Sequence, residues 1–275
     1  MADLKKLITA SDFTLVDMAG HEGEHQLVLA VNGQEGSGKT FFSLSAPGPI
    51  AYFNIDKGLQ RVVKSLPHNG KQIIKCEISI PERLGNKPEE KLKIEARQQL
   101  DKFYKNYKAA LTDPNVRSIV IDNSSTLWDL ILLTHFGKTT QIKQQMRTAP
   151  NLEMQQIVRA PIDDPNCTKV VVHIQQVKKE YKGDDWDGKS WEASGYNKMS
   201  FLVDAAIMLA KNDKKRIITA TVTKPGMQLA KQGAVWTLGS YDGDESVLDT
   251  FGFPPFAFVA SELTDTDPDD WEDKR

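Results

Sequence analysis

Short apolar runs recur along the first two thirds of the chain, and polar or turn-forming residues separate them. Four runs have the length and the β-branched content of buried strands, at 26–31, 50–55, 118–121 and 170–174. Between them, apolar residues at three- and four-residue steps predict helices, most clearly over 100–111 and 127–136. Buried strands that alternate with helices favour an α/β fold with a mainly parallel sheet covered on both faces.

The pattern changes after Gln176. Residues 182–197 are rich in Gly, Asp, Trp and Ser, so we expect a long loop there. Further apolar runs at 203–209, 216–223 and 234–238 predict strands that extend the sheet antiparallel at one edge. Because no internal repeat or long linker is visible, we expect one compact core over 25–260, preceded by a polar N-terminal segment at 1–24.

Composition excludes several classes of protein. The chain has 275 residues, and its 40% hydrophobic and 26% charged fractions are those of a globular protein. No apolar run is long enough to cross a bilayer, and Met1–Lys6 lacks the apolar stretch of a secretion signal. Cys76 and Cys167 are far apart and lack metal-ligand spacing. We therefore expect a cytoplasmic protein without a membrane partner.

Charge is unevenly distributed. The net charge is −2, but residues 262–275 hold seven acids and two bases, so the remainder carries +3. We therefore expect 261–275 to be a disordered acidic tail. The tail either keeps the protein soluble or binds a partner, as a mimic of DNA that competes for a basic surface.

One motif carries most of the chemistry. It fits G-x-x-x-x-G-K-[ST], follows an apolar run and precedes a short helical pattern, which is the context of a phosphate-binding loop. Its glycines let backbone N–H groups surround the phosphates of ATP, the lysine reaches the β- and γ-phosphates, and the last hydroxyl ligates Mg²⁺. The motif consists of Gly33, Gln34, Glu35, Gly36, Ser37, Gly38, Lys39 and Thr40.

Three residues at strand ends complete the predicted site. Asp122 ends a buried run and is the expected second Mg²⁺ partner. Many ring ATPases have a catalytic Glu directly after this Asp, but here the next residue is Asn123. Asp56 is therefore the candidate that activates water. Its alternative role is to cap the N-terminus of a possible helix at 57–65. Gln176 is the candidate that senses the γ-phosphate, and Gln175 competes with it.

In this order, the motifs resemble the RecA family, and in particular the RecA-like phage ATPases associated with single-strand annealing and recombination. Residues 53–59 resemble the segment that carries the catalytic carboxylate of RecA, where the family usually has Glu. Residues 121–124 are similar to the metal-binding strand, and 174–178 to the strand that ends in the sensing glutamine. The resemblance covers about residues 26–240 and implies a RecA-like core.

The resemblance also implies partners. Residues 221–224 and 231–234 are similar to the edge strands that bear the inter-subunit lysines of RecA, so Lys224 is a candidate to complete a neighbour's ATP site; an exposed lysine before a turn is the alternative. The resemblance further implies a homo-oligomer, as a ring or a filament. A partner of the acidic tail would then be a single-strand-binding protein or another recombination protein, and a phage origin would place the protein in the cytoplasm of a bacterial host.

Two basic segments occupy the positions of the DNA-contacting loops of the family. Bases interleaved with aromatic residues suit single-stranded DNA, because bases stack on rings and phosphates need cations. A solvated loop is the alternative, since Asp184, Asp185, Asp187 and Glu192 dilute the charge. The candidate DNA-binding residues are Lys178, Lys179, Lys182, Trp186, Lys189 and Trp191 after the sensing glutamine, with Lys143 and Arg147 in the second segment.

From the sequence we expect a Mg²⁺-dependent ATPase that binds single-stranded DNA, assembles with itself and acts in recombination or strand annealing. The alternative is a nucleotide-gated binding protein with marginal hydrolysis that recruits a partner through its acidic tail.

Overall fold

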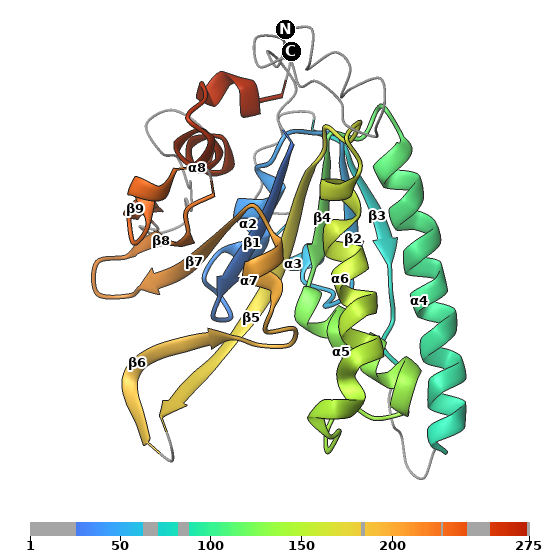
Figure 1. Ribbon diagram of the computed structural model, residues 1–275. Helices are drawn as coiled ribbons and strands as arrows, with labels where there is room; N and C mark the ends of the chain where they lie inside the picture. The colour runs from blue at the N-terminus through green and yellow to red at the C-terminus, as the bar shows by residue number, and fades with distance from the viewer. Residues whose placement is uncertain are drawn as a thin grey trace, which may run out of the picture.

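The computed structural model describes residues 26–62, 71–81, 88–182, 185–226, 228–240 and 254–273. The segment expected at 1–24 lies outside these ranges, so the division of the chain at residue 25 stays a prediction. A twisted sheet forms the centre of the molecule, and helices cover both of its faces (Figure 1).

Within the described ranges, the sheet has the order β3-β2-β4-β5-β1-β7-β8-β9, and β6 pairs with β5. The strands from β3 to β7 in this order are all parallel, and β8 and β9 are antiparallel, which confirms the predicted architecture. The strands are β1 (Leu27–Gly33), β2 (Ile50–Asn54), β3 (Ile73–Glu77), β4 (Ser118–Asp122), β5 (Val170–Lys182), β6 (Asp185–Ala193), β7 (Ala205–Asn212), β8 (Ile217–Lys224) and β9 (Val235–Ser240).

The strand β7 differs from the prediction, because it runs parallel to β1 and not antiparallel. The segment between β6 and β7 carries the chain back along the sheet, so that the Asp204 amide donates to the Val28 carbonyl over 2.9 Å before β7 begins. Only β8 and β9 therefore form the antiparallel edge.

Helices α4, α5 and α6 pack on one face of the sheet, and α2 and α8 pack on the other. Residues that alternate along β2 point to opposite faces, as a strand requires. Phe53 contacts Phe103 of α4 with ring centroids 5.0 Å apart, whereas Tyr52 belongs to the opposite cluster. The helices are α2 (Lys39–Leu44), α3 (Leu59–Val62), α4 (Glu89–Thr112), α5 (Ser124–Phe136), α6 (Thr148–Asp163), α7 (Met199–Leu202) and α8 (Pro255–Thr264), with short 3₁₀ segments η2 (Gln144–Arg147), η3 (Leu229–Lys231) and η4 (Pro268–Trp271).

The long loop expected at 182–197 is wrong. β5 continues well past the end of β1 and pairs antiparallel with β6, so most of this segment is a hairpin. Because β6 pairs only with β5 in the described residues, and Lys178, Lys179 and Glu192 are exposed, the hairpin does not require the apolar alternation that reveals a strand in a sequence.

The disordered tail expected at 261–275 is also wrong over its described residues. α8 extends into it, η4 follows, and the Trp271 side chain is 1% exposed and packs edge-on against Phe256 with ring centroids 6.2 Å apart. Burial of a large aromatic side chain contributes on the order of 3 kcal/mol to the free energy of folding. Burial of Trp271 therefore favours an ordered segment despite the surrounding acids.

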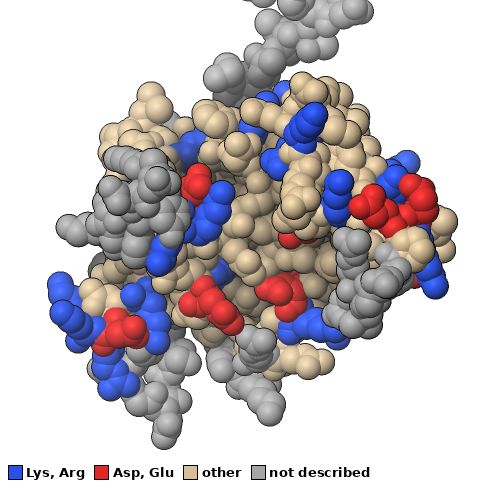
Figure 2. Space-filling view, turned by 90° about the horizontal axis from the view of Figure 1, so that it is seen from below, with Lys and Arg blue, Asp and Glu red and all other residues tan. Residues whose placement is uncertain are grey.

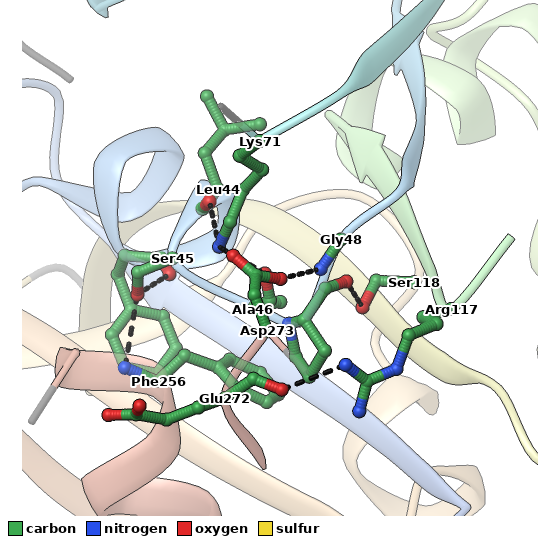
Figure 3. Close-up of polar contacts among 12 residues, drawn as sticks. Leu44, Ser45, Ala46, Gly48, Lys71, Arg117, Ser118, Phe256, Glu272 and Asp273 are labelled. Atoms are coloured by element: carbon green, nitrogen blue, oxygen red, sulfur yellow. Dashed lines mark hydrogen bonds and ion pairs between the residues drawn. The ribbon is translucent and has the colours of Figure 1, made fainter. Parts of the chain in front are cut away.

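Residues after Trp271 continue this packing at the edge of the sheet where the strands begin (Figure 3). The Lys71 ammonium lies 3.3 Å from the Asp273 carboxylate and donates to the Ala46 carbonyl over 2.7 Å. Arg117 donates to the Glu272 carbonyl over 2.8 Å. The core thus provides a counter-ion for Asp273 and a donor for the backbone of Glu272.

Of the helices in the described part of the chain, none combines the length and the apolar character that crossing a bilayer would require.

Candidate nucleotide-binding site

The predicted phosphate loop links the end of β1 to the start of α2, at the edge of the sheet where the parallel strands end. Its backbone requires glycine: Gly36 and Gly38 have φ of 74° and 84°, which other residues rarely adopt. A Cβ at Gly33 would lie 2.5 Å from Ser37 Oγ and 2.6 Å from the Leu209 carbonyl oxygen. The residue types of the motif thus follow from the shape of the loop.

The Lys39 side chain folds over this loop. Its ammonium donates to the carbonyl oxygens of Gly33 and Gln34, over 2.7 Å and 2.6 Å. Burial lowers the pKa of Lys39, and the negative charges of Asp122, Asp56 and Glu35 oppose that effect. The predicted phosphate ligand is therefore a partly buried cation surrounded by carboxylates and backbone.

Two hydroxyl groups meet one carboxylate oxygen beside the loop. Thr40 Oγ1 donates to Asp122 Oδ2 over 2.8 Å, and the Tyr52 hydroxyl donates to the same atom. Asp122 is 4% exposed, and burial raises its pKa, which the bonds from Tyr52 and Thr40 counteract. The pair predicted from the sequence, Thr40 and Asp122, is thus in direct contact.

Sequence reasoning missed Tyr52. It lies on β2, and β2 pairs with β4, the strand that ends in Asp122. Burial, and next the charge of Asp122, raise the pKa of the phenol, so the hydroxyl remains a donor to that carboxylate. The signal was present in the sequence: a tyrosine inside a fully buried apolar strand requires a partner for its hydroxyl.

Asp56 lies just past the end of β2, where two amide side chains reach it. Its Oδ2 accepts from Asn123 Nδ2 over 3.0 Å and from Gln176 Nε2 over 3.4 Å. The helix that Asp56 was considered to cap begins only at Leu59. Asn123 instead caps α5, since its Oδ1 accepts from the Thr126 amide over 2.7 Å.

The two competing glutamines point to opposite faces of β5. Gln175 is 1% exposed, and its amide donates to the carbonyls of Ser194 and Tyr196 over 3.4 Å and 3.3 Å. Gln176 faces Asp56 instead. Of the two candidates, Gln176 is therefore the one whose side chain lies with the phosphate-loop edge.

Other predicted residues lie elsewhere. The Lys224 ammonium, at the end of β8, donates to the Val203 carbonyl and, over 3.5 Å, to that of Phe201. In the strand register, Lys224 is opposite Ala206 of β7. Ala206 lies three residues before Leu209, which is opposite Gly33 of the phosphate loop. A role for Lys224 in a neighbour's site requires its ammonium to leave these carbonyls, and it stays a prediction.

The predicted DNA-binding residues divide between two places. Lys178 and Lys179 lie on β5 and Trp191 on β6, and Lys178 forms a 3.1 Å ion pair with Glu192. Lys182, Trp186 and Lys189 belong to the same hairpin, but their side chains lie outside the described residues. Exposed Lys143 precedes η2, and half-buried Arg147 ends it.

The residues at this edge fit a magnesium–nucleotide complex. A hydroxyl and a carboxylate are the hard oxygen donors that Mg²⁺ prefers. A Cβ at Gly58 would lie 3.5 Å from Asp122 Oδ2 and 3.8 Å from Thr40 Oγ1, so the backbone leaves room beside that pair where a side chain would intrude. Among the described residues, no group of three or more His, Cys, Asp and Glu side chains is arranged to hold a metal ion.

Comparison with known proteins identifies the fold of the chain and not a family. No family model and no curated protein matches the chain. Among solved structures, the RadB recombinase superposes with a TM-score of 0.50 at 15% identity, over 80% of this chain and 90% of that one. A KaiC-like protein from Pyrococcus horikoshii OT3 gives 0.45 at 13% identity, over 78% and 89%. A type III secretion ATPase gives 0.41 at 10% identity, over 67% of this chain and about half (51%) of that one. With its sheet order and phosphate loop, the chain has a RecA-like P-loop fold.

Proposed function

We propose that the protein is a Mg²⁺-dependent ATPase of DNA recombination that binds single-stranded DNA, assembles with itself and promotes strand annealing. One observation supports the proposal most: Lys39, the Thr40–Asp122 pair and the Asp56–Gln176 pair come from four separate segments and meet at one edge of the sheet. Ligands bind at this edge in open α/β sheets.

Each residue has a chemical task in hydrolysis. The loop amides and the Lys39 ammonium hold the phosphates and balance the charge that develops on the γ-phosphoryl oxygens. Thr40 and Asp122 would hold Mg²⁺, which would supply Lewis-acid stabilisation of the charge that develops on the phosphates. Asp56 orients a water and accepts its proton as the water oxygen bonds to the γ-phosphorus and the bond to the ADP oxygen breaks.

Asp56 is well placed for this task. Asn123 and Gln176 both donate to Oδ2, and within the described residues Oδ1 has no hydrogen-bond partner and can accept from water. Loss of the γ-phosphate would change the surroundings of Gln176. Because β5 continues from Gln176 directly into the β5–β6 hairpin, that change would pass to the predicted DNA-binding segment.

The alternative, a nucleotide-gated binding protein, retains one argument, since Asp56 is one methylene shorter than the usual glutamate. Its other argument, a free acidic tail, is weakened by the contacts of Trp271 and Asp273 with the core.

ATP turnover measured with and without single-stranded DNA separates the two functions. We expect DNA to stimulate turnover at least about fivefold, the lower range of coupling between two sites. Turnover that is marginal and unaffected by DNA would favour the gated binding protein.

A second test concerns the tyrosine that the sequence did not reveal. Tyr52→Phe removes one of the two hydroxyl donors to Asp122 Oδ2, so the carboxylate is less firmly oriented. We expect the Mg²⁺ concentration for half-maximal ATP binding to rise about tenfold, as is typical when a partner of a metal ligand is lost.

Tyr107→Phe is the matched control. Tyr107 lies on α4, and its buried hydroxyl donates to the Ile157 carbonyl of α6. Calorimetric titration of ATP at several Mg²⁺ concentrations makes the comparison. An unchanged Mg²⁺ dependence in Tyr52→Phe would show that the tyrosine serves folding alone.

A further inference from the structure

The turn between β7 and β8 is strongly basic, and none of the sequence motifs includes it. Its residues 211–216 include four bases and one acid, a net charge of +3: Lys211, Asp213, Lys214, Lys215 and Arg216. The segment 177–193, expected to bind DNA, has four bases and five acids, a net charge of −1. A polyanion is attracted to the first segment and not to the second.

The topology places this turn next to the phosphate loop. β1 lies between β5 and β7, and Gly33 is level with Gln176 on one side and with Leu209 on the other. β7 then continues for three residues to Asn212 before the chain turns, a rise of about 10 Å at 3.3 Å per residue. Two hairpins therefore extend from the strands on either side of the nucleotide site (Figure 1).

Two side chains of the turn, those of Lys214 and Lys215, are available to a partner. All residues from 211 to 216 are exposed. Lys211 pairs with Asp213 over 2.9 Å, whereas the ammonium groups of Lys214 and Lys215 form no ion pair with any described residue. Figure 2 views this end of the molecule, and basic side chains gather there at the lower left.

We infer that the β7–β8 turn, through Lys214 and Lys215, contacts the phosphates of the single-stranded DNA bound by the protein. The inference rests on the proposed function. It assigns the contact with the DNA phosphates to the β7–β8 turn and not to the β5–β6 hairpin. The β5–β6 hairpin, with its aromatic residues, would then face the bases. Lysines on a short turn can reach successive phosphates without reading sequence.

The test is the double variant Lys214→Ala, Lys215→Ala. Single-stranded DNA binding is titrated at several salt concentrations. We expect the affinity to fall at least about tenfold near 0.1 M salt, and the slope of log K against log salt to become shallower by about 1.4, since each lost phosphate contact removes about 0.7.

The matched control is Lys105→Ala, Lys108→Ala, which removes the same charge from exposed positions of α4. Thermal unfolding verifies that both variants are folded. Loss confined to the turn variant supports the inference. Equal loss in both variants overturns it, because net charge alone would then explain the effect.

Two other outcomes also decide the question. If the wild type binds DNA and the turn variant binds equally well with the same slope, the inference is wrong, the proposed function stands, and the turn is left as a contact for an acidic protein surface. If the wild type hydrolyses ATP and binds no single-stranded DNA, the DNA part of the proposed function has failed, and the inference falls with it.

Discussion

Lys39→Ala is expected to lower ATP turnover by at least about 100-fold while leaving the protein folded. Removal of one fixed donor at the developing charge typically costs on the order of 10²–10³ in rate. Among the described residues, the ammonium donates hydrogen bonds to the Gly33 and Gln34 carbonyls. Gln34 is exposed, so water can replace the ammonium there. Loss of Lys39 therefore affects phosphate binding and not the core.

The measurement is steady-state turnover of ATP, together with thermal unfolding of the same samples. Lys105→Ala, an exposed lysine of α4, is the matched control and should retain full turnover. Turnover by Lys39→Ala within about threefold of wild type, far from the loss expected for a missing donor, would contradict the assignment of the phosphate loop.

Asp56→Asn is expected to lower kcat by about 10²–10⁴-fold with little change in KM, the usual contribution of a general base. Asparagine keeps the size of the side chain and an oxygen that can accept from Asn123 and Gln176, but it cannot take a proton from water. Asp56 is exposed, so folding should be unaffected.

Asp56→Glu is the complementary variant, because it keeps a carboxylate and adds one methylene group to the side chain. A retained carboxylate predicts activity well above that of Asp56→Asn. If kcat is unchanged in Asp56→Asn, the base lies elsewhere, and Asp56 would serve only to hold the Asn123 and Gln176 amides.

The fold was predictable from the sequence where burial on both faces leaves a continuous apolar run. β1, β2 and β4 are fully buried, and each was located to within two residues. The phosphate loop was predictable because its shape demands glycines at fixed spacing. Asp122 and Asp56 followed from the rule that the carboxyl ends of parallel strands meet at one edge.

Other features depend on contacts that no local pattern encodes. The β5–β6 hairpin is defined by the backbone pairing of its two strands, and its polar composition resembles that of a loop. Trp271 is one aromatic residue among acids, and only its tertiary contacts with Phe256 and Thr266 show that the segment is ordered. The direction of β7 depends on the path of the preceding segment.

The central claim is that the loop from Gly33 to Thr40, with Asp122, binds a nucleoside triphosphate. Isothermal titration calorimetry of the folded protein with ATP in the presence of Mg²⁺ tests it most directly. The account predicts saturable binding of one ATP per chain, strongly weakened in Lys39→Ala. Absence of heat with every nucleoside triphosphate, on protein that unfolds cooperatively, would contradict it.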